Sequence, residues 1–489
     1  MKRLPQSVVT AAVIMLLTGF TAGQQQAPSI HQIEHAAHQG QRYPEEVPGL
    51  SRQAVPLTPR DTALAREVFG FHPYWMGIAW QKYRLSLLTT IAYFGADISA
   101  TGEIVDAHNW PVNSLITAAH SAGVRVVLTA ILFNSSDIST LLESSINRNR
   151  LIQHLTTSVE NAGADGVNID FEGVPGSQRT NLVTFLRDLS DVFHARIPDS
   201  RVTIDVPAVD WHSAFDYQAL AEACDGLMIM GYDYHWSQSP TTGPVAPLTG
   251  WGTYNLTWTV NNYLDKTEGA RDKLILGLPY YGYQWTADSK EPGASVIGTG
   301  EPKTYAQAEG LAESLGKLRS DQGGQIPWYR YAETTTWQQG WYDDSLSLSL
   351  KYDFANLMGL GGVGIWALGY DGDRTELWDA LGGYLEKEVP LPDTTAPGLR
   401  LAAYPNPFGE NITIRYQVPD NFNSPVSLAV YNVRGQQMAV FFEDNYVLTS
   451  GVVRWNGRNP RGEQAASGVY FIVGRDYFHT ETLKITLLR

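Results

Sequence analysis

The stretch DGVNIDFEGV, residues 165–174, alternates polar and apolar side chains. Asn168, Asp170 and Glu172 share one parity, and the residues between them are apolar. Residues two apart on a β-strand lie on the same face, so the pattern predicts a strand with one amide and two carboxyl groups on one side. An exposed edge strand could also carry such a face, and the stretch alone leaves that alternative open.

The surrounding sequence repeats a short apolar run followed by a longer amphipathic segment. The runs lie at residues 68–75, 89–98, 123–132, 165–172, 201–210, 225–234, 273–283 and 359–371. Apolar strands alternating with helices are typical of parallel βα units, and eight units favour an α/β fold of the (β/α)8 TIM-barrel class. A doubly wound open sheet is the rival, but no glycine-rich phosphate loop follows the first run. Residues 284–358 predict a small subdomain inserted between strands seven and eight.

In a barrel, the polar face of residues 165–174 has to point inward, because helices cover the outside of the strands. The C-terminal ends of the strands form the catalytic face of such barrels. Burial of carboxyl groups is costly unless they are paired or hydrogen-bonded. Two close carboxylates resist double ionisation, so one stays protonated near neutral pH and can act as a general acid. Glu172 has the longer side chain and the outermost position, and we predict that it is this acid.

Several motifs then resemble glycoside hydrolase family 18, the chitinase-like barrels, over about 320 residues. The fourth strand of that family carries DxxDxDxE, which here reads Asp165, Asn168, Asp170 and Glu172. Supporting motifs follow in the family's order: MGYDY at residues 230–234, GLPYYGYQW at 277–285 and GGVGIWALGYD at 361–371. One DxDxE is a weak signal, whereas the ordered set is specific.

The resemblance implies substrate-assisted, retaining hydrolysis without a metal or cofactor. Glu172 would protonate the glycosidic oxygen, Asp170 would orient the sugar's 2-acetamido group, and Tyr232 would hydrogen-bond its oxygen. The residues expected to support catalysis are Asn168, Asp165, Asp233 and Met230. Those expected to bind substrate are Trp366, Trp75, Trp236, Trp285 and Tyr283, with core packing as the alternative for each tryptophan, as for Trp110 and Trp211.

Asn168 departs from the commonest family pattern, which has an aspartate that shares a proton with the middle aspartate. Asparagine carries no charge but can donate a hydrogen bond to Asp170, so we expect altered pH dependence. Similar strings occur in family branches that act on peptidoglycan fragments. The sequence therefore favours hydrolysis of β-1,4-linked N-acetylglucosamine polymers, with chitin, peptidoglycan and N-glycans all open. A lectin-like binding barrel and a surface adhesion protein are the alternatives, and the presence of Glu172 argues against them.

The N-terminal residues predict export. Lys2 and Arg3 precede an apolar run of about 13 residues, which is typical of a signal peptide over residues 1–23 and too short for a membrane span. Residues 24–64 are polar and predict a flexible leader, with His31, His35 and His38 as solvated side chains. The net charge of −15 argues against nucleic acids as partners. Residues 65–388 form the predicted catalytic domain.

The C-terminal residues predict a second domain. Residues 389–400 read as a Pro/Thr-rich linker, and 401–489 show short alternating strands with Gly, Asn and Pro turns, typical of an antiparallel β-sandwich. AYPNPF at 403–408 and WNGRNPRGEQAASGVYF at 455–471 resemble the sorting domain of the bacterial type IX secretion system. The resemblance implies the secretion machinery as a partner and a secreted or cell-surface location. A carbohydrate-binding or fibronectin-like sandwich is the alternative.

Overall fold

A computed structural model of the chain describes residues 28–44, 55–59, 64, 66–320, 325–385, 399–404, 406–409, 411–418, 425–446, 451–459, 461–476 and 480–488. The predicted signal peptide (1–23) and most of the predicted linker (389–398) lie outside the described residues. No helix in the described part of the chain is both long and apolar enough to cross a membrane.

Eight parallel strands close into a barrel, which confirms the predicted fold class. Their order is β1-β14-β8-β7-β6-β5-β4-β2, and β2 pairs with β1 to close the ring. The predicted fourth strand is β5. The strands are β1 (Glu67–Pro73), β2 (Thr90–Ile98), β4 (Arg125–Leu132), β5 (Gly166–Phe171), β6 (Arg201–Pro207), β7 (Gly226–Met230), β8 (Leu274–Pro279) and β14 (Gly362–Trp366), and a short β3 (Ile104–Asp106) pairs antiparallel with β2.

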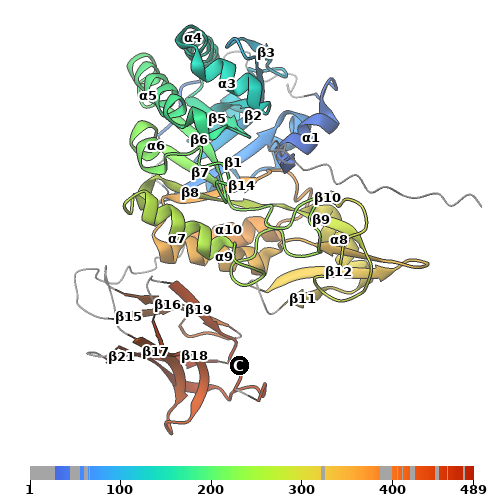
Figure 1. The fold of residues 1–489 in the computed structure, drawn as a ribbon, viewed down its shortest axis with the longest axis vertical. Helices are drawn as coiled ribbons and strands as arrows, with labels where there is room; N and C mark the ends of the chain where they lie inside the picture. Colours follow the sequence, from blue (N-terminus) through green and yellow to red (C-terminus); the bar gives the residue numbers. More distant parts are fainter. Residues whose placement is uncertain are drawn as a thin grey trace, which may run out of the picture.

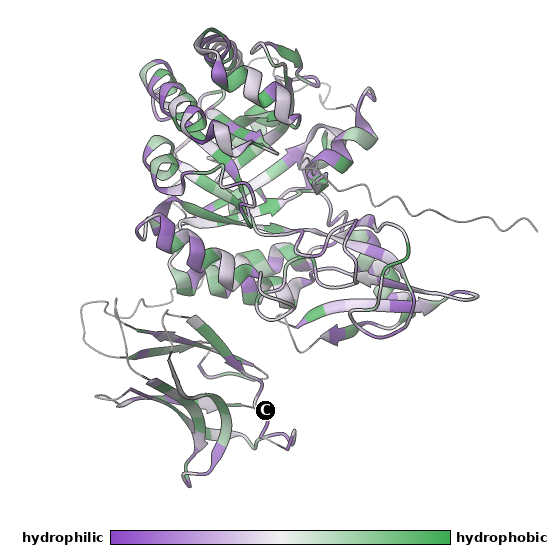
Figure 2. Ribbon diagram, viewed as in Figure 1, coloured by the Kyte–Doolittle hydropathy of each residue, from purple (hydrophilic) through white to green (hydrophobic). Residues whose placement is uncertain are grey.

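Helices cover the outside of the barrel (Figure 1). Phe171 of β5 stacks on Phe185 of a covering helix with ring centroids 5.8 Å apart, so the apolar parity of β5 faces the helices as predicted. Hydrophobic residues gather in the barrel strands and on the inner sides of the helices (Figure 2). The helices are α2 (Asn113–Ser121), α3 (Ser135–Glu143), α4 (Ser145–Ala162), α5 (Arg179–Arg196), α6 (Tyr217–Ala223), α7 (Leu256–Lys266), α9 (Ser345–Met358) and α10 (Glu376–Leu385).

The predicted insertion between strands seven and eight is an α+β subdomain. Its five antiparallel strands have the order β10-β9-β13-β12-β11, and α8 (Tyr305–Leu315) packs beside them. The strands are β9 (Tyr281–Ala287), β10 (Glu301–Thr304), β11 (Leu318–Ser320), β12 (Ile326–Ala332) and β13 (Trp337–Trp341). The apolar run 273–283, predicted as one strand, is therefore two, because the chain leaves the barrel after Pro279 and enters the subdomain sheet at Tyr281.

The C-terminal strands form two antiparallel sheets around a separate apolar core. Arg415 and Arg454 donate hydrogen bonds to the carbonyls of Leu357 and Leu350, so this sandwich contacts α9 of the barrel. The sheets have the orders β15-β16-β19 and β18-β17-β20-β21, with β15 (Arg400–Tyr404), β16 (Ile412–Gln417), β17 (Pro425–Asn432), β18 (Gln437–Tyr446), β19 (Gly451–Trp455), β20 (Gly468–Arg475) and β21 (Thr480–Leu487).

The prediction of a flexible leader is wrong for residues 30–38, which form helix α1 (Ile30–His38). Ser29 caps the helix by accepting a hydrogen bond from the amide of Gln32, and His35 and His38 lie in its last turn, where positive charge is favourable. Figure 1 shows α1 against the barrel, beside β1 and β2. Residues 55–59 also contact the barrel, because His120 bonds to the backbone of Val55 and Thr58.

Candidate active site

Three carboxyl groups converge at the C-terminal end of β5 and β6. Asp170 and Glu172 come from β5 and the residue after it, and Asp205 comes from the neighbouring strand β6. All three are buried. Asp170 and Glu172 therefore point into the barrel, as predicted, because alternate residues of β5 face its interior.

The environment of Glu172 suits a general acid. Burial and the negative charge of Asp170 raise the pKa of Glu172, whereas hydrogen bonds from His31 and Ser29 lower it. The net pKa lies above the ordinary value, so a larger fraction of this carboxyl is protonated near neutral pH. A carboxyl with a raised pKa is what proton donation to a leaving group requires.

The residues after β7 complete the polar wall of the site. Tyr232 and Asp233 lie next to the carboxyl groups of β5. The imidazole of His31 shows this, because one of its nitrogens contacts Asp170 Oδ2 and the other contacts Tyr232 Oη. Asp233 accepts a hydrogen bond from Tyr281 Oη. Burial raises the pKa of Asp233 to about 6. The MGYDY motif thus places Tyr232 and Asp233 beside the carboxyl cluster.

Asn168 does not make the predicted hydrogen bond. Its Nδ2 donates to Asp205 Oδ2 at 2.9 Å, and its Oδ1 accepts from Thr203 Oγ1 at 2.7 Å. The amide therefore faces β6, away from Asp170. Asp205 was missed, although Thr203 and Asp205 sit at alternate positions of RVTIDV, the same signal that identified the polar face of β5.

Of the other two predicted supporting residues, only Asp165 lies apart from the carboxyl cluster. Asp165 precedes β5, at the opposite end of the strand from Glu172, where its carboxylate binds the Val126 amide and His120 Nε2. These contacts fix the start of the strand, so the expected catalytic support from Asp165 is wrong. Met230 ends β7 and lines the open pocket next to Glu172.

Trp366 and Trp75 are both buried, and parts of α1 cover them. The His31 ring stacks on Trp366 with centroids 3.7 Å apart, and the His38 ring stacks on Trp75 at 5.0 Å. Trp366 ends β14, at the same end of the barrel as Glu172. Both tryptophans therefore present a ring face toward the space that α1 fills.

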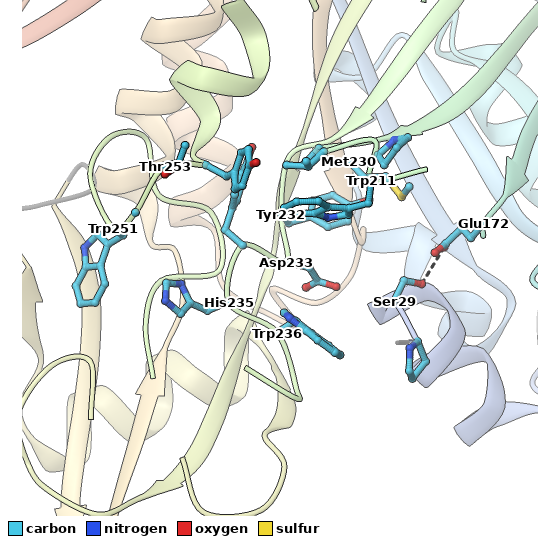
Figure 3. A pocket seen from close by; sticks show the side chains of 17 residues that line it. Ser29, Glu172, Trp211, Met230, Tyr232, Asp233, His235, Trp236, Trp251 and Thr253 are labelled. Atoms are coloured by element: carbon cyan, nitrogen blue, oxygen red, sulfur yellow. Dashed lines mark hydrogen bonds between the residues drawn. The ribbon is translucent and has the colours of Figure 1, made fainter. Parts of the chain in front are cut away.

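An open pocket of about 480 Å³ lies next to Glu172, which lines it together with Ser29. Figure 3 shows Trp211, Met230, Tyr232, Asp233 and Trp236 around it. The Trp211 side chain is 66% exposed, which suits a stacking platform for a ligand. The sequence left its role open, and Trp251 and Tyr254, which also line the pocket, were not identified.

The remaining predicted substrate-binding residues are Trp236, Trp285 and Tyr283. Trp236 lines the pocket. Trp285 is fully buried, and its Nε1 donates to the Trp236 carbonyl at 3.2 Å. Tyr283 is buried beside it, with ring centroids 5.5 Å apart. Trp285 therefore supports Trp236 and does not line the pocket. Burial, Asp233 and Glu34 raise the pKa of Tyr283, so its side chain lies near the groups of the site and its contact with substrate stays a prediction.

Helix α1 enters the site with its N-terminal end. His31 Nδ1 lies 2.8 Å from Asp170 Oδ2 and 3.3 Å from Glu172 Oε1, and its Nε2 lies 2.9 Å from Tyr232 Oη. Burial alone would lower the pKa of His31, but the two carboxylates raise it well above its usual value. Ser29 Oγ donates to Glu172 Oε1 at 2.8 Å, the bond drawn in Figure 3.

The rest of α1 lies along the same cleft. Glu34 Oε2 accepts hydrogen bonds from Trp366 Nε1 at 3.1 Å and from Tyr370 Oη at 2.6 Å, and burial raises its pKa to about 7. His35 Nε2 lies 3.1 Å from Asp97 Oδ1. The prediction of solvated histidines is wrong for His31 and His35, which are buried.

Two groups of described side chains bring histidine and carboxylate atoms within 4.8 Å of one another: His35, Asp97 and His108, and His31, Asp170 and Asp205. We interpret both as hydrogen-bonded ion pairs. Both nitrogens of His31 have protein partners, and His35 and His108 each bond to Asp97. Burial would raise the pKa of Asp97, but these hydrogen bonds lower it to about 2.

The family model for glycosyl hydrolases family 18 matches residues 71–371. The chain belongs to this family. It is a glycosidase with a chitinase-like barrel. The match covers every barrel strand from within β1 to β14, together with the inserted subdomain, and it leaves α1 and the C-terminal sandwich outside.

Individual relatives include a chitobiase, a cortical fragment-lytic enzyme and a chitinase domain of known structure. The chain is 30% identical to di-N-acetylchitobiase of Rattus norvegicus over 341 residues, which covers 62% of this chain and 84% of that protein. It is 24% identical to the cortical fragment-lytic enzyme of Bacillus subtilis over 298 residues, covering 58% and 65%. The crystal structure of Ostrinia furnacalis group II chitinase catalytic domain 2 superposes with a TM-score of 0.59 at 23% identity, covering 67% and 98%.

Proposed function

We propose that the protein is a secreted, retaining glycosidase that cleaves β-1,4-linked N-acetylglucosamine polymers by substrate-assisted catalysis. One observation carries the proposal. Asp170, Glu172 and Tyr232 all contact a single imidazole, which lies flat on Trp366. A general acid, an orienting carboxylate and a phenol hydroxyl therefore converge on a site the size of one ring with an aromatic floor.

The proposed reaction starts when Glu172 donates its proton to the glycosidic oxygen. The bond between that oxygen and the anomeric carbon breaks as the acetamido oxygen attacks the same carbon, which forms an oxazolinium ion. Asp170 accepts a hydrogen bond from the acetamido N–H and stabilises the positive charge, while Tyr232 donates to the acetamido oxygen. Glu172, now ionised, takes a proton from water as the water oxygen attacks the anomeric carbon. The bond between that carbon and the acetamido oxygen breaks, which restores the acetamido group, and the product retains its configuration.

The substrate class follows from the acetamido requirement. Chitin, chito-oligosaccharides and the glycan of peptidoglycan all contain N-acetylglucosamine, and relatives named for chitobiose and for spore cortex fragments support both kinds of substrate. We place chito-oligosaccharides first. Peptidoglycan glycan is the alternative, and a binding-only barrel is disfavoured because Glu172 is present and has a raised pKa.

Comparing acetylated with deacetylated substrate tests this function. Because α1 fills the cleft, chitohexaose, its deacetylated counterpart and peptidoglycan strands would each be incubated with wild type and with His31→Ala, and products analysed by mass spectrometry. We expect cleavage of N-acetylated substrate only, with the β-anomer as the first product by NMR. Equal cleavage of the deacetylated oligomer, or α-anomer formation, would contradict the mechanism. Binding without cleavage by both proteins would favour the lectin-like alternative.

The proposal also includes export through the type IX secretion system. The N-terminal residues that resemble a signal peptide and the AYPNPF and ASGVYF motifs support it, and the antiparallel sandwich that carries these motifs is consistent with a sorting domain. Proteomic analysis of culture medium and outer membrane from the producing organism would locate the protein and show whether residues 401–489 are retained.

A further inference from the structure

We propose that α1 is a built-in inhibitory segment, which occupies the sugar site through Ser29, His31 and Glu34 and has to leave before substrate binds. The inference rests on the proposed function for the identity of the competing ligand. Its physical basis is independent, because α1 lies outside residues 71–371 and contributes no strand or covering helix to the barrel.

The segment engages each predicted catalytic group. Ser29 binds Glu172 at 2.8 Å, and the His31 ring binds Asp170 at 2.8 Å and Tyr232 at 2.9 Å. An imidazole offers two polar atoms on a flat ring, as an acetamido group offers an N–H and an oxygen on a planar unit. His31 therefore takes the two hydrogen-bonding groups that the mechanism assigns to the substrate.

The charge of the segment matches the charge of the site. Protonated His31 places positive charge between two carboxyl groups, where the proposed reaction develops positive charge on the sugar. The amide of Ile30, at the positive N-terminal end of the helix, also donates to Asp233 Oδ2 at 3.2 Å. The docked segment thus resembles the charged intermediate more than a neutral sugar.

The docked helix depends on the cleft for its conformation. Nine residues are too few for a stable isolated helix in water, where roughly 12–15 are marginal. Beside its ring contacts, the helix makes polar contacts with the barrel that use titratable groups, including Glu34 on Trp366 and Tyr370 and His35 on Asp97. Hydrogen bonds from a sugar can replace such polar contacts when the helix leaves. A sugar could not replace purely apolar contacts in the same way.

Hydrogen exchange of residues 30–38 in the full chain measures docking without reference to activity. We expect strong protection in wild type and in Ala36→Gln, a matched control at an exposed position of the helix. His31→Ala should lose the protection by a factor of at least ten, as should Glu34→Ala. Unprotected amides in wild type, or unchanged protection in both variants, would overturn the proposal.

Steady-state kinetics on a fluorogenic chito-oligosaccharide tests whether the docked helix inhibits the enzyme. An internal competitor raises the apparent KM by the inverse of the open fraction and leaves kcat nearly unchanged. We therefore expect His31→Ala to lower KM at least tenfold with kcat within about twofold, and Ala36→Gln to match wild type. Unchanged KM despite lost protection would overturn inhibition. Loss of protection in a protein with no activity on any acetylated glycan would instead count against the proposed function alone.

A ligand titration separates competition from simple tethering. Chitohexaose added to wild type should accelerate exchange in α1, because both ligands need Asp170 and Tyr232. If calorimetry shows that chitohexaose binds while the amides of α1 stay protected, the two do not share a site. That result would overturn the proposal.

A second inference comes from β6. We infer that Asp205 is a positioning residue that holds a proton for Asp170, in place of the aspartate that position 168 lacks; this inference also rests on the proposed function. A carboxyl oxygen of Asp205 lies within 4.8 Å of one of Asp170. Among the described residues, Oδ1 of each is buried without a hydrogen-bond partner. Asn168 Nδ2 holds the other Asp205 oxygen at 2.9 Å.

The protonation of Asp205 agrees with this geometry. Burial and then the charge of Asp170 raise the pKa of Asp205 well above its usual value. A neutral Asp205 can donate its hydrogen to the free oxygen of Asp170 once α1 has left. That bond would stabilise ionised Asp170 and leave its other oxygen for the acetamido N–H.

Two substitutions in a His31→Ala background distinguish a proton-holding role from packing. Asp205→Asn keeps a neutral donor, so we expect kcat within about threefold and an unchanged acid limb of the pH profile of kcat/KM. Asp205→Ala removes the donor and should lower kcat at least tenfold and move the acid limb to higher pH. An Asp205→Asn enzyme as impaired as Asp205→Ala would overturn the inference, as would a normal acid limb in Asp205→Ala. The binding of an oxazoline, measured by fluorescence in every variant, detects misfolded sites. Cleavage of non-acetylated substrates with the pH profile of wild type would count against the proposed function and not against this inference.

Discussion

Glu172→Gln in a His31→Ala background is expected to lower kcat on chito-oligosaccharides by about 10²–10⁴-fold, the range that general acid catalysis contributes. Glutamine keeps the shape of the side chain and cannot supply a proton. Glu172 is buried, and Asp170 helps to raise its pKa, so the native group retains a proton that the leaving oxygen needs.

The docked helix has a further effect on this acid. His31 and Ser29 are the two hydrogen-bonding partners that lower the pKa of Glu172. Their departure removes both effects, and the charge of Asp170, which raises the pKa of Glu172, stays in place.

Binding provides the control for this substitution. The affinity for chito-oligosaccharide, followed by tryptophan fluorescence, should change by less than about fivefold in Glu172→Gln, because only the proton has been removed. Turnover within threefold of the parent would show that the proton comes from another group.

The docking of α1 is expected to weaken as pH rises from about 5 to 8, and Glu34→Gln is expected to remove a large part of this dependence. Glu34 has a pKa of about 7 when docked and about 4.3 when free, so docking takes up a proton between these values. The stability that this proton supplies is fully present below the free pKa and is lost as pH rises through about 7.

His31 acts in the same direction over a higher range. Its docked pKa is raised well above 6.5, so its contribution is present below about 6.5 and is lost as pH rises through the docked value. Asp97, with a docked pKa of about 2, affects docking only at strongly acidic pH. Among the described residues, the titratable or charged groups that face His31 and Glu34 are Asp170, Glu172, Asp205, Tyr232, Asp233, Tyr283 and Tyr370.

Glutamine at position 34 resembles protonated glutamate and can accept the same bonds from Trp366 and Tyr370. The difference in Glu34 pKa corresponds to a change in docking constant on the order of a hundredfold at pH 8. We expect protection factors for residues 30–38 at pH 8 to be higher in Glu34→Gln than in wild type, and equal at pH 4.5. Faster exchange in Glu34→Gln than in wild type at pH 8 would show that Glu34 docks as a carboxylate.

The barrel and the buried carboxyl groups of β5 could be predicted because both leave periodic signals. Continuous apolar runs mark the parallel strands, and a polar residue at every second position of β5 is costly unless it serves a site. The same reasoning applied to β6 would have found Thr203 and Asp205. The side chain of Asn168 could not be oriented from sequence, since its choice between Asp170 and Asp205 depends on the packing of two neighbouring strands.

Helix α1 was missed for a physical reason. A helix that covers an apolar surface shows an apolar stripe, but α1 covers a polar cleft, and its inward stripe is His31, Glu34, His35 and His38. Such a stripe reads as solvated sequence. The available signal was Ser29 as an N-cap followed by polar residues at helical spacing, which becomes informative only when the carboxyl cluster opposite is known. Trp285 was misplaced because the sequence does not mark where the chain leaves β8 for the subdomain.

The most direct test of the account is product analysis of chitohexaose incubated with the full chain as wild type, His31→Ala and His31→Ala/Glu172→Gln, at equal concentration and at a low concentration of substrate. We predict slow release of shorter N-acetylated oligomers by wild type, release at least tenfold faster by His31→Ala, and almost none by the double variant. Equal rates in all three proteins would contradict both the role of Glu172 and the restraint by α1.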